Sequence, residues 1–221
     1  MDQSKTHLTT QGQGPRDDTR ERLLDAAECL FCRKGFEATS IRDLTLLAGC
    51  NVAAVNYHFG GKEQLYQQMF RRQMKKMIDD HIKIISRVMS GPAPKLEDLL
   101  LGLVGPPLRA VHQNEPRGMV MQLMAREVLN RHIDPELVMR DLKEVFVKHF
   151  SEAIQKLEPG LNGFRAKLVA FSSEATVFHP LLFMQYYLSW IDGLDVDKLI
   201  DHIVRFNVAA IRGLSRGTSE S

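Results

Sequence analysis

Two short patterns in the sequence could do covalent chemistry. Cys29 and Cys32 form a C-x-x-C pair, a spacing found in redox sites and in one half of a zinc site. Gly213, Ser215 and Gly217 form G-x-S-x-G, which presents a nucleophilic serine in hydrolases. That fold places its acid and its histidine after the serine, but only four residues follow this pattern, and no strand is expected before it. We therefore expect no catalytic residue here and no enzyme.

The cysteine pair lies inside a predicted helix rather than after a strand. A disulfide between two positions in one helical turn would strain the helix. A zinc site would need Cys50 and a distant histidine to complete four ligands. We interpret Cys29 and Cys32 as unreactive packing or surface thiols and expect no metal site, although the sequence alone leaves a redox-sensing role open.

The residues from Thr39 to Lys62 predict two short helices joined by a tight turn. Ser40 and Asp43, three residues apart, form a capping box. Apolar residues recur at helical spacing behind the cap, at Ile41, Leu44, Leu47 and Ala48. Gly49 allows the positive φ at which this first helix must end.

Asn51 can cap the second helix, which we expect from Val52 to Phe59. On a helical wheel Val52, Val55 and Phe59 fall together as anchors. The opposite face carries Ala53, Ala54, Tyr57 and His58. Small residues let a backbone approach base edges, while Asn56 on the flank could bind adenine or satisfy a local backbone group. Such a helix pair is the minimal apparatus for placing a helix in the major groove of DNA.

A longer helix is expected before this pair, from Asp17 or Asp18 to Lys34, with Gly35 as its stop. Its apolar face comprises Leu23, Ala27, Leu30 and Phe31. The three helices together resemble the DNA-binding region of the TetR family of transcriptional repressors. The match runs from about residue 19 to 65 and consists of LLDAA, LF, GF, TS, AG, YHF and KEQL in the family's order and spacing.

The chain departs from the usual family pattern at three positions. Thr45 stands where the family usually has alanine, and Cys50 and Asn51 replace the common valine and serine. The replacements are conservative in size, so they affect packing detail more than function.

The resemblance implies a homodimeric, ligand-responsive regulator, most often a repressor, that binds double-stranded operator DNA and leaves it on binding a small molecule. It implies no cofactor. Matching positions assign phosphate contacts to Ser40 and Lys62, together with Tyr57 and His58. They assign base contacts to Arg42, Ala53, Ala54 and Asn56.

The composition is that of an ordinary globular protein, with 221 residues, 44% of them hydrophobic and 25% charged. The net charge of +2 is weak for a nucleic-acid binder, so charge alone does not indicate DNA. No secretory leader opens the chain, no apolar run is long enough to span a bilayer, and three cysteines suggest no disulfide framework. We expect a cytoplasmic protein without membrane contact.

The chain divides by composition into an arm without fixed structure (1–17), a helix-turn-helix domain (18–61), a connecting helix (62–90), a second helical domain (91–214) and a disordered tail (215–221). Helical periodicity recurs over about 96–112, 117–131, 135–157, 162–178, 181–190 and 196–214. The expected interruptions include Pro106 with Pro107, Pro180 and Gly193. Because no stretch shows sustained strand alternation, the predicted fold is all-α.

The last two long helices carry wide apolar stripes. One comprises Leu168, Phe171, Ala175 and Phe178, and the other Leu199, Ile203, Val204, Val208 and Ile211. The family resemblance implies that two such helices from each subunit form a four-helix dimer interface. Periodicity alone leaves open that the stripes are core of a single chain.

Polar residues also interrupt the apolar periodicity of the second domain. They are Arg126 and Glu127, close to Met124, and Glu174 and His179 further along the chain. Such groups pair with one another, face water or line a cavity, because an unpaired buried charge is costly. Methionines give adaptable cavity walls, so we expect these residues near a small-molecule site.

Two rival functions follow from the same residues. One is an enzyme in the second domain, which no acid–base pair or nucleophile of usable spacing supports. The other is an adaptor that uses its helix-turn-helix to bind protein, which would show no affinity for DNA.

Overall fold

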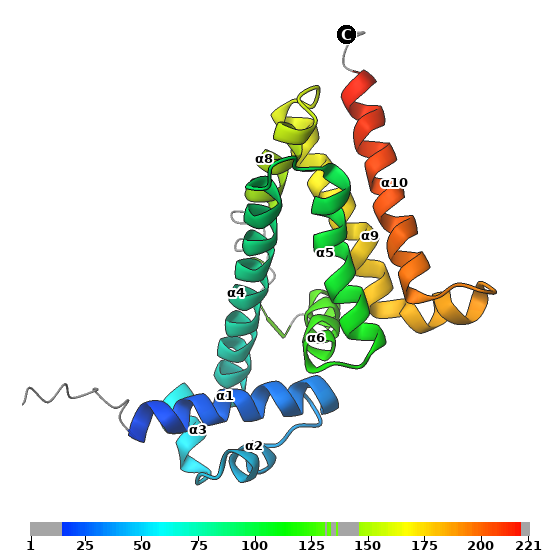
Figure 1. Cartoon of the computed structure of the whole chain (residues 1–221). Helices are drawn as coiled ribbons and strands as arrows, with labels where there is room; N and C mark the ends of the chain where they lie inside the picture. The colour runs from blue at the N-terminus through cyan, green and yellow to red at the C-terminus, as the bar shows by residue number, and fades with distance from the viewer. Residues whose placement is uncertain (1–14, 131, 134–135, 137–145, 218–221) are drawn as a thin grey trace, which may run out of the picture. The chain divides into compact units, whose positions relative to one another are not determined.

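The computed structural model describes residues 15–130, 132–133, 136 and 146–217. In this part of the chain every regular element is a helix, which confirms the all-α prediction (Figure 1). In chain order the helices are α1 (Pro15–Lys34), α2 (Ile41–Ala48), α3 (Ala53–Phe59), α4 (Lys62–Met89), α5 (Leu96–His112), α6 (Pro116–Asn130), α8 (Lys148–Leu157), α9 (Gly163–Trp190) and α10 (Val196–Arg216).

The chain forms two compact units, Met1–Tyr66 and Gln67–Ser221. Helices α1 to α3 and the first residues of α4 belong to the first unit. Helix α4 runs without a break, so a single helix contains residues of both units. It corresponds to the connecting helix expected over 62–90.

An apolar core holds the first unit together. Its buried side chains include Leu23, Leu24, Ala27, Phe31, Leu44, Ala48, Val55 and Phe59. The Phe31 ring meets the edge of Tyr66 at a centroid distance of 4.8 Å, and Phe36 lies 5.0 Å from the same tyrosine ring. Aromatic contacts of this kind add to the stabilisation from burial alone. They fix the start of α4 against α1 and the residues that follow α1.

Helix α5 lies at the centre of the second unit, where α6, α9 and α10 pack against it. Its buried residues run from Leu96 to Val111 and join a core with α8, α9 and α10. Arg212 of α10 ties three segments together, because its guanidinium lies 2.8 Å from Glu97 and 3.2 Å from Glu158.

Two expected proline breaks are wrong. Pro106 and Pro107 lie inside α5, and Pro180 lies inside α9. A proline in a helix interior removes one backbone hydrogen bond, and burial of the helix can offset that loss. Pro107 and Pro180 are both buried. In α9 the backbone leaves helical geometry at Phe183 (φ −122°, ψ 17°), so the helix is kinked after Pro180 rather than ended by it.

The expected ends of the ordered chain also need correction. Helix α1 begins at Pro15, within the arm expected over 1–17, and proline suits a first helical turn because its missing N–H needs no partner there. Ser215 and Arg216 belong to α10 rather than to the expected tail. The rest of the arm (1–14), residues 218–221 of the tail, and 137–145 of the helix expected over 135–157 lie outside the described residues.

Candidate nucleic-acid interface and helical cavity

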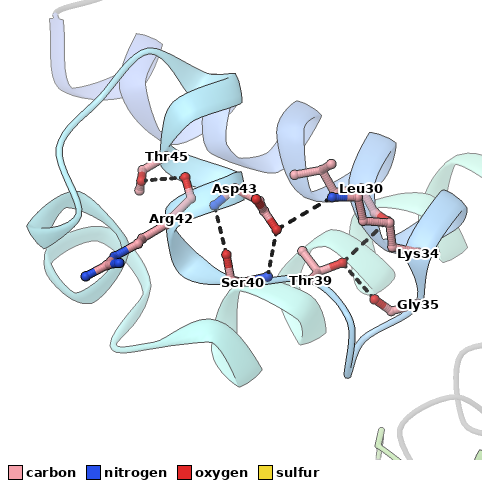
Figure 2. Close-up of polar contacts among 8 residues, drawn as sticks. All are labelled: Leu30, Lys34, Gly35, Thr39, Ser40, Arg42, Asp43 and Thr45. Atoms are coloured by element: carbon pink, nitrogen blue, oxygen red, sulfur yellow. Dashed lines mark hydrogen bonds and ion pairs between the residues drawn. The ribbon is translucent and has the colours of Figure 1, made fainter.

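The start of α2 is fixed by the capping box that the sequence predicts. The backbone N–H of Asp43 donates to Ser40 Oγ at 3.1 Å, and the N–H of Ser40 donates to Asp43 Oδ2 at 3.3 Å (Figure 2). Lys34 of α1 lies 3.6 Å from the same carboxylate. The hydrogen bonds from Ser40, with the charge of Lys34, hold the pKa of Asp43 below its usual value. The carboxylate therefore stays ionised and joins α2 to the end of α1.

The segment before α2 is fixed by Thr39, which is buried. Its hydroxyl donates to the carbonyl of Gly35 at 2.7 Å (Figure 2). Arg42 points away from this network and is exposed. The arrangement leaves the Arg42 guanidinium available to a partner in solution.

The turn between α2 and α3 has the two features expected from the sequence. Gly49 adopts the left-handed conformation (φ 63°), and Asn51 Oδ1 accepts a hydrogen bond from the N–H of Ala54 at 3.0 Å. The side chains of Val55 and Phe59, both on α3, are buried. These contacts hold α3 by one side and leave its other side to solvent.

The residues expected to contact DNA lie on or beside the outer surface of α2 and α3. Ser40, Arg42, Ala53, Asn56 and Tyr57 are exposed, and Ala54, His58 and Lys62 are half-buried. The Tyr57 and His58 rings meet edge to face at 4.9 Å. Lys62 Nζ lies 4.3 Å from the centroid of the Phe36 ring. The structure therefore brings all eight residues into one unit around α2, α3 and the start of α4.

Two apolar residues of this region's helical pattern are exposed, and one of them, Val52, contradicts its prediction as an anchor. Val52 is 52% exposed and stands before α3 begins, while Leu47 is 53% exposed. Thr45 is buried instead, and its hydroxyl donates to the carbonyl of Ile41 at 3.0 Å. That bond satisfies a polar group inside the core, which explains how threonine replaces the usual alanine. Leu46 is 83% exposed, and it is not among the residues expected to contact DNA.

The second unit contains a cavity of about 130 Å³ between α4, α5, α6, α8 and α9. Its apolar wall includes Met74, Met77, Leu103, Met121, Phe150 and Leu181. The polar residues on the wall are His81, Ser173 and Glu174. Of the five residues expected at a ligand site, the structure places Met124 and Glu174 on this wall.

The other three expected ligand residues lie elsewhere. Arg126 is exposed and donates to the carbonyl of Gln122 at 3.2 Å. Glu127 is buried, and its Oε1 lies 3.2 Å from His132 Nδ1. His179 is exposed, with its Nδ1 2.8 Å from the Tyr187 hydroxyl. Each has a local partner, although Glu127 Oε2 is buried and has no hydrogen-bond partner among the described residues.

The sequence analysis missed His81, although a signal was present. His81 follows Met74, Met77 and Ile78 at helical spacing and precedes Ile85 in the same way. Burial, more than the nearby Arg117, lowers the pKa of His81 to about 4, so the imidazole is neutral at pH 7. Burial raises the pKa of Glu174 to about 7. A histidine within an apolar stripe therefore marked a polar point on the cavity wall.

The nine residues expected at a dimer interface divide into two groups. Leu199, Ile203, Val204, Val208 and Ile211 are buried in the core of the second unit, so they are not available to another copy. On α9, Leu168 and Ala175 are exposed, Phe171 packs at the edge of the core and Phe178 lines the cavity. The exposed apolar face of α10 instead carries Phe206 and Leu214.

Neither motif for covalent chemistry has the surroundings that its chemistry would need in the described part of the chain. Cys29, Cys32 and Cys50 are of intermediate exposure and form no disulfide. Gly213 and Ser215 lie in α10 rather than after a strand. Within the described residues no three His, Cys, Asp or Glu side chains gather as a metal site. The helices found there are also too short or too polar to cross a membrane.

Comparison with known proteins agrees with this geometry. Residues 23–69 match the family described as "Bacterial regulatory proteins, tetR family". The HTH-type transcriptional repressor KstR2 of Rhodococcus jostii is 31% identical over 78 residues, which is 33% of this chain and 38% of that protein. The HTH-type transcriptional regulator AcrR of Shigella flexneri is 22% identical over 107 residues, or 48% of each chain. The aligned part thus spans less than half the length of these curated relatives.

The likeness in fold extends much further than the likeness in sequence. The fatty acid degradation regulator FadR from Bacillus halodurans has a TM-score of 0.65 at 16% identity, covering 91% of this chain and 99% of that one. Residues 23–69 therefore carry the helix-turn-helix region of the TetR family of bacterial regulatory proteins, and the fold of the chain as a whole is similar to that of a solved member of this class of regulators.

Proposed function

We propose that this protein is a DNA-binding transcriptional regulator, a repressor that occupies an operator as a homodimer and leaves it when a small molecule binds. The observation that carries the proposal is the capped α2, Gly49 turn and α3, with Val55 and Phe59 buried and the opposite face exposed. This is the arrangement by which a helix-turn-helix inserts its second helix into the major groove. A protein with this role would act in the cytoplasm, where its DNA target lies.

The side chains of this surface fall into two groups, one suited to contact phosphates and the other suited to contact bases. Ser40 Oγ accepts from Asp43, which leaves its O–H as a donor to a phosphate, and Lys62 adds a positive charge. Tyr57 and His58 supply further donors to the backbone. The guanidinium of Arg42 and the amide of Asn56 can make bidentate contacts with guanine and adenine, while Ala53 and Ala54 allow close approach. Phosphate contacts position the helix, and base contacts select the site.

A homodimer would present two reading helices, one for each half-site of the operator. The face of α9 and α10 contains a groove of about 530 Å³, whose lining combines polar side chains with several exposed apolar residues. They include Phe164, Leu168, Phe206 and Leu214. Contiguous exposed apolar surface marks an interaction site, and a second copy of the same face would cover it. Two reading helices spaced roughly 34 to 36 Å apart would then reach successive major grooves.

The cavity of the second unit supports a role for a small-molecule effector. α4 contributes Met74, Met77 and His81 to its wall, and the same helix contains the first residues after the helix-turn-helix. A ligand that shifts α4 would alter the spacing of the two reading helices in the dimer. The effector needs only to favour the conformation that binds DNA poorly.

Selection from a pool of random duplex DNA tests the proposed function. The full-length protein should enrich one inverted-repeat sequence and bind it at least about a thousandfold more tightly than unrelated duplex. Arg42→Ala and Asn56→Ala should each relax the preference at particular bases, whereas Arg87→Ala, an exposed arginine of the second unit, should not. Failure to enrich any duplex would reject DNA binding and favour an adaptor for protein partners.

A further inference from the structure

Two polar groups of the cavity wall lack the partners that other buried polar side chains of the second unit have. Glu127 has one oxygen paired with His132, although its Oε2 has no partner among the described residues, and Asn207 donates to the carbonyl of Ile203 at 2.8 Å. By contrast, no described group pairs with the Glu174 carboxylate, and the buried Nδ1 of His81 has no hydrogen-bond partner among the described residues. Both residues line the same cavity. Unpaired groups of this kind call for an explanation, and a ligand is one.

The two groups offer a particular kind of hydrogen bonding. A carboxylate only accepts hydrogen bonds, and a neutral imidazole with its proton on Nε2 accepts at Nδ1. His81 is uncharged at pH 7, so it does not repel a cation. Ser173 adds a hydroxyl oxygen to the same wall. The described lining of the cavity therefore presents acceptors and one carboxyl group that can carry a negative charge, and it contains no Lys or Arg.

The remaining wall suits an apolar body with an aromatic ring. The His81 and Phe146 ring centroids lie 4.9 Å apart, and Phe146 and Phe150 are stacked at 5.5 Å. Aromatic faces attract cations, and methionine side chains such as Met77 and Met121 adapt to the shape of a ligand. An apolar cavity of about 150 Å³ holds one benzene molecule, so a cavity of this size takes a single-ring compound.

We propose that the cavity binds a small organic cation, an apolar one-ring compound with a protonated amine. The ammonium group donates to the Glu174 carboxylate and to His81 Nδ1, and the ring lies among Met77, Phe146 and Phe150. This assignment names the ligand class of the effector site in the proposed function. An anion of the same size should not bind, because the described lining offers no Lys or Arg to pair with it and an ionised Glu174 would repel it.

Three probes of one size test the charge preference. Benzylamine is protonated at pH 7.5, benzyl alcohol is neutral, and benzoate is negative. In calorimetric titrations of the full-length protein, benzylamine should bind at least about tenfold more tightly than benzyl alcohol, because a charge-assisted hydrogen bond is the stronger kind. Benzoate should show no binding. Equal affinities for benzylamine and benzyl alcohol, or no binding of benzylamine, would overturn the assignment.

Two matched variants locate the effect. Glu174→Gln keeps the shape of the side chain and should reduce the preference for benzylamine over benzyl alcohol to about threefold or less. Glu152→Gln, an exposed position on α8, should keep the full preference. An undiminished preference in Glu174→Gln would reject the site. The probe series on the unaltered protein decides the charge preference even where Glu174→Gln fails to fold.

A separate measurement distinguishes this inference from the proposed function. The selected operator is titrated with protein in the presence and absence of benzylamine. Selective benzylamine binding without any change in DNA affinity would uphold the ligand class and reject the effector role. Release of DNA by benzyl alcohol as readily as by benzylamine would uphold the effector role and reject the ligand class.

Discussion

In the first unit the Lys62 ammonium lies over the face of Phe36, with Nζ 4.3 Å from the ring centroid. A cation in this position is attracted by the ring by about 0.5–1 kcal/mol at an exposed site. The ring limits the conformations of a long side chain without using its N–H donors. Lys62 is thus held close to the helix-turn-helix in the protein alone, which would reduce the entropy lost if Lys62 binds a DNA phosphate as proposed.

Replacing Lys62 tests the proposed phosphate contact. Lys62→Ala should weaken operator binding at all sequences alike, and the slope of log K against log salt concentration should fall in magnitude by about 1. Fluorescence anisotropy with a labelled operator over a range of KCl concentrations measures both. Lys167→Ala, an exposed lysine of α9, provides the control. An unchanged slope in Lys62→Ala would show that Lys62 does not bind phosphate.

Phe36→Leu separates the charge of Lys62 from its positioning. This variant keeps the ammonium but removes the ring beneath it, so affinity should fall while the salt slope stays near that of the unaltered protein. Because Phe36 also contacts Phe31 and Tyr66, urea unfolding must first show that the variant is folded at the assay temperature. A fall in slope equal to that of Lys62→Ala would contradict the proposed positioning role.

The capping box predicts a stability effect that does not depend on DNA. Ser40→Ala removes the acceptor of the Asp43 N–H and should lower the free energy of unfolding by about 1 kcal/mol. Urea denaturation followed by circular dichroism measures the change. Ser86→Ala, at an exposed position inside α4, should alter stability by less than about 0.5 kcal/mol. Equal effects in the two variants would contradict the capping role.

Local chemistry was predictable from the sequence, and tertiary burial was not. The Ser40–Asp43 box, the Gly49 turn and the Asn51 cap depend on residues a few positions apart. The prediction that Val52 anchors α3 is wrong because Val52 precedes the helix. A helix of seven residues is too short for a helical wheel to define the residue at which it begins. His81 was missed because only the packing of five helices shows that it lines a cavity. Apolar periodicity likewise does not show whether an apolar stripe of a helix is buried in the core of its own chain or covered by a second copy.

Exposed and buried apolar residues of α10 should respond differently to substitution, and this difference tests the proposed dimer. Phe206 is 57% exposed on α10, whereas Ile203 is buried in the core of the same helix. Phe206→Glu should yield a folded monomer, because it introduces a charge into the proposed interface only. Ile203→Glu should unfold the second unit, since it leaves an unpaired charge in the core. Light scattering with size-exclusion chromatography gives the mass, and circular dichroism gives the fold. A Phe206→Glu protein that remains a dimer would place the interface elsewhere.

The two cavity groups should have opposite effects on stability between pH 4 and pH 7. The pKa of Glu174 is raised from 4.5 to about 7, so the folded state holds a proton that the unfolded chain releases, and stability falls as pH rises through this window. The pKa of His81 is lowered from 6.5 to about 4, so the unfolded chain takes up a proton first, and stability falls as pH drops from 6.5 to 4. The two contributions therefore largely cancel between pH 4.5 and 6.5.

Single variants should separate these opposing contributions. Relative to the unaltered protein, Glu174→Gln should gain stability as pH rises from 4.5 to 7, by up to about 3 kcal/mol, because the penalty of ionising a buried carboxyl is gone. His81→Leu should gain stability as pH falls from 6.5 to 4. The Asp80–Arg117 pair, 3.2 Å apart and close enough to influence His81, remains in both variants and so drops out of the comparison. Urea unfolding at several pH values measures each difference. Curves that run parallel to that of the unaltered protein would show that neither group titrates in the folded cavity as inferred.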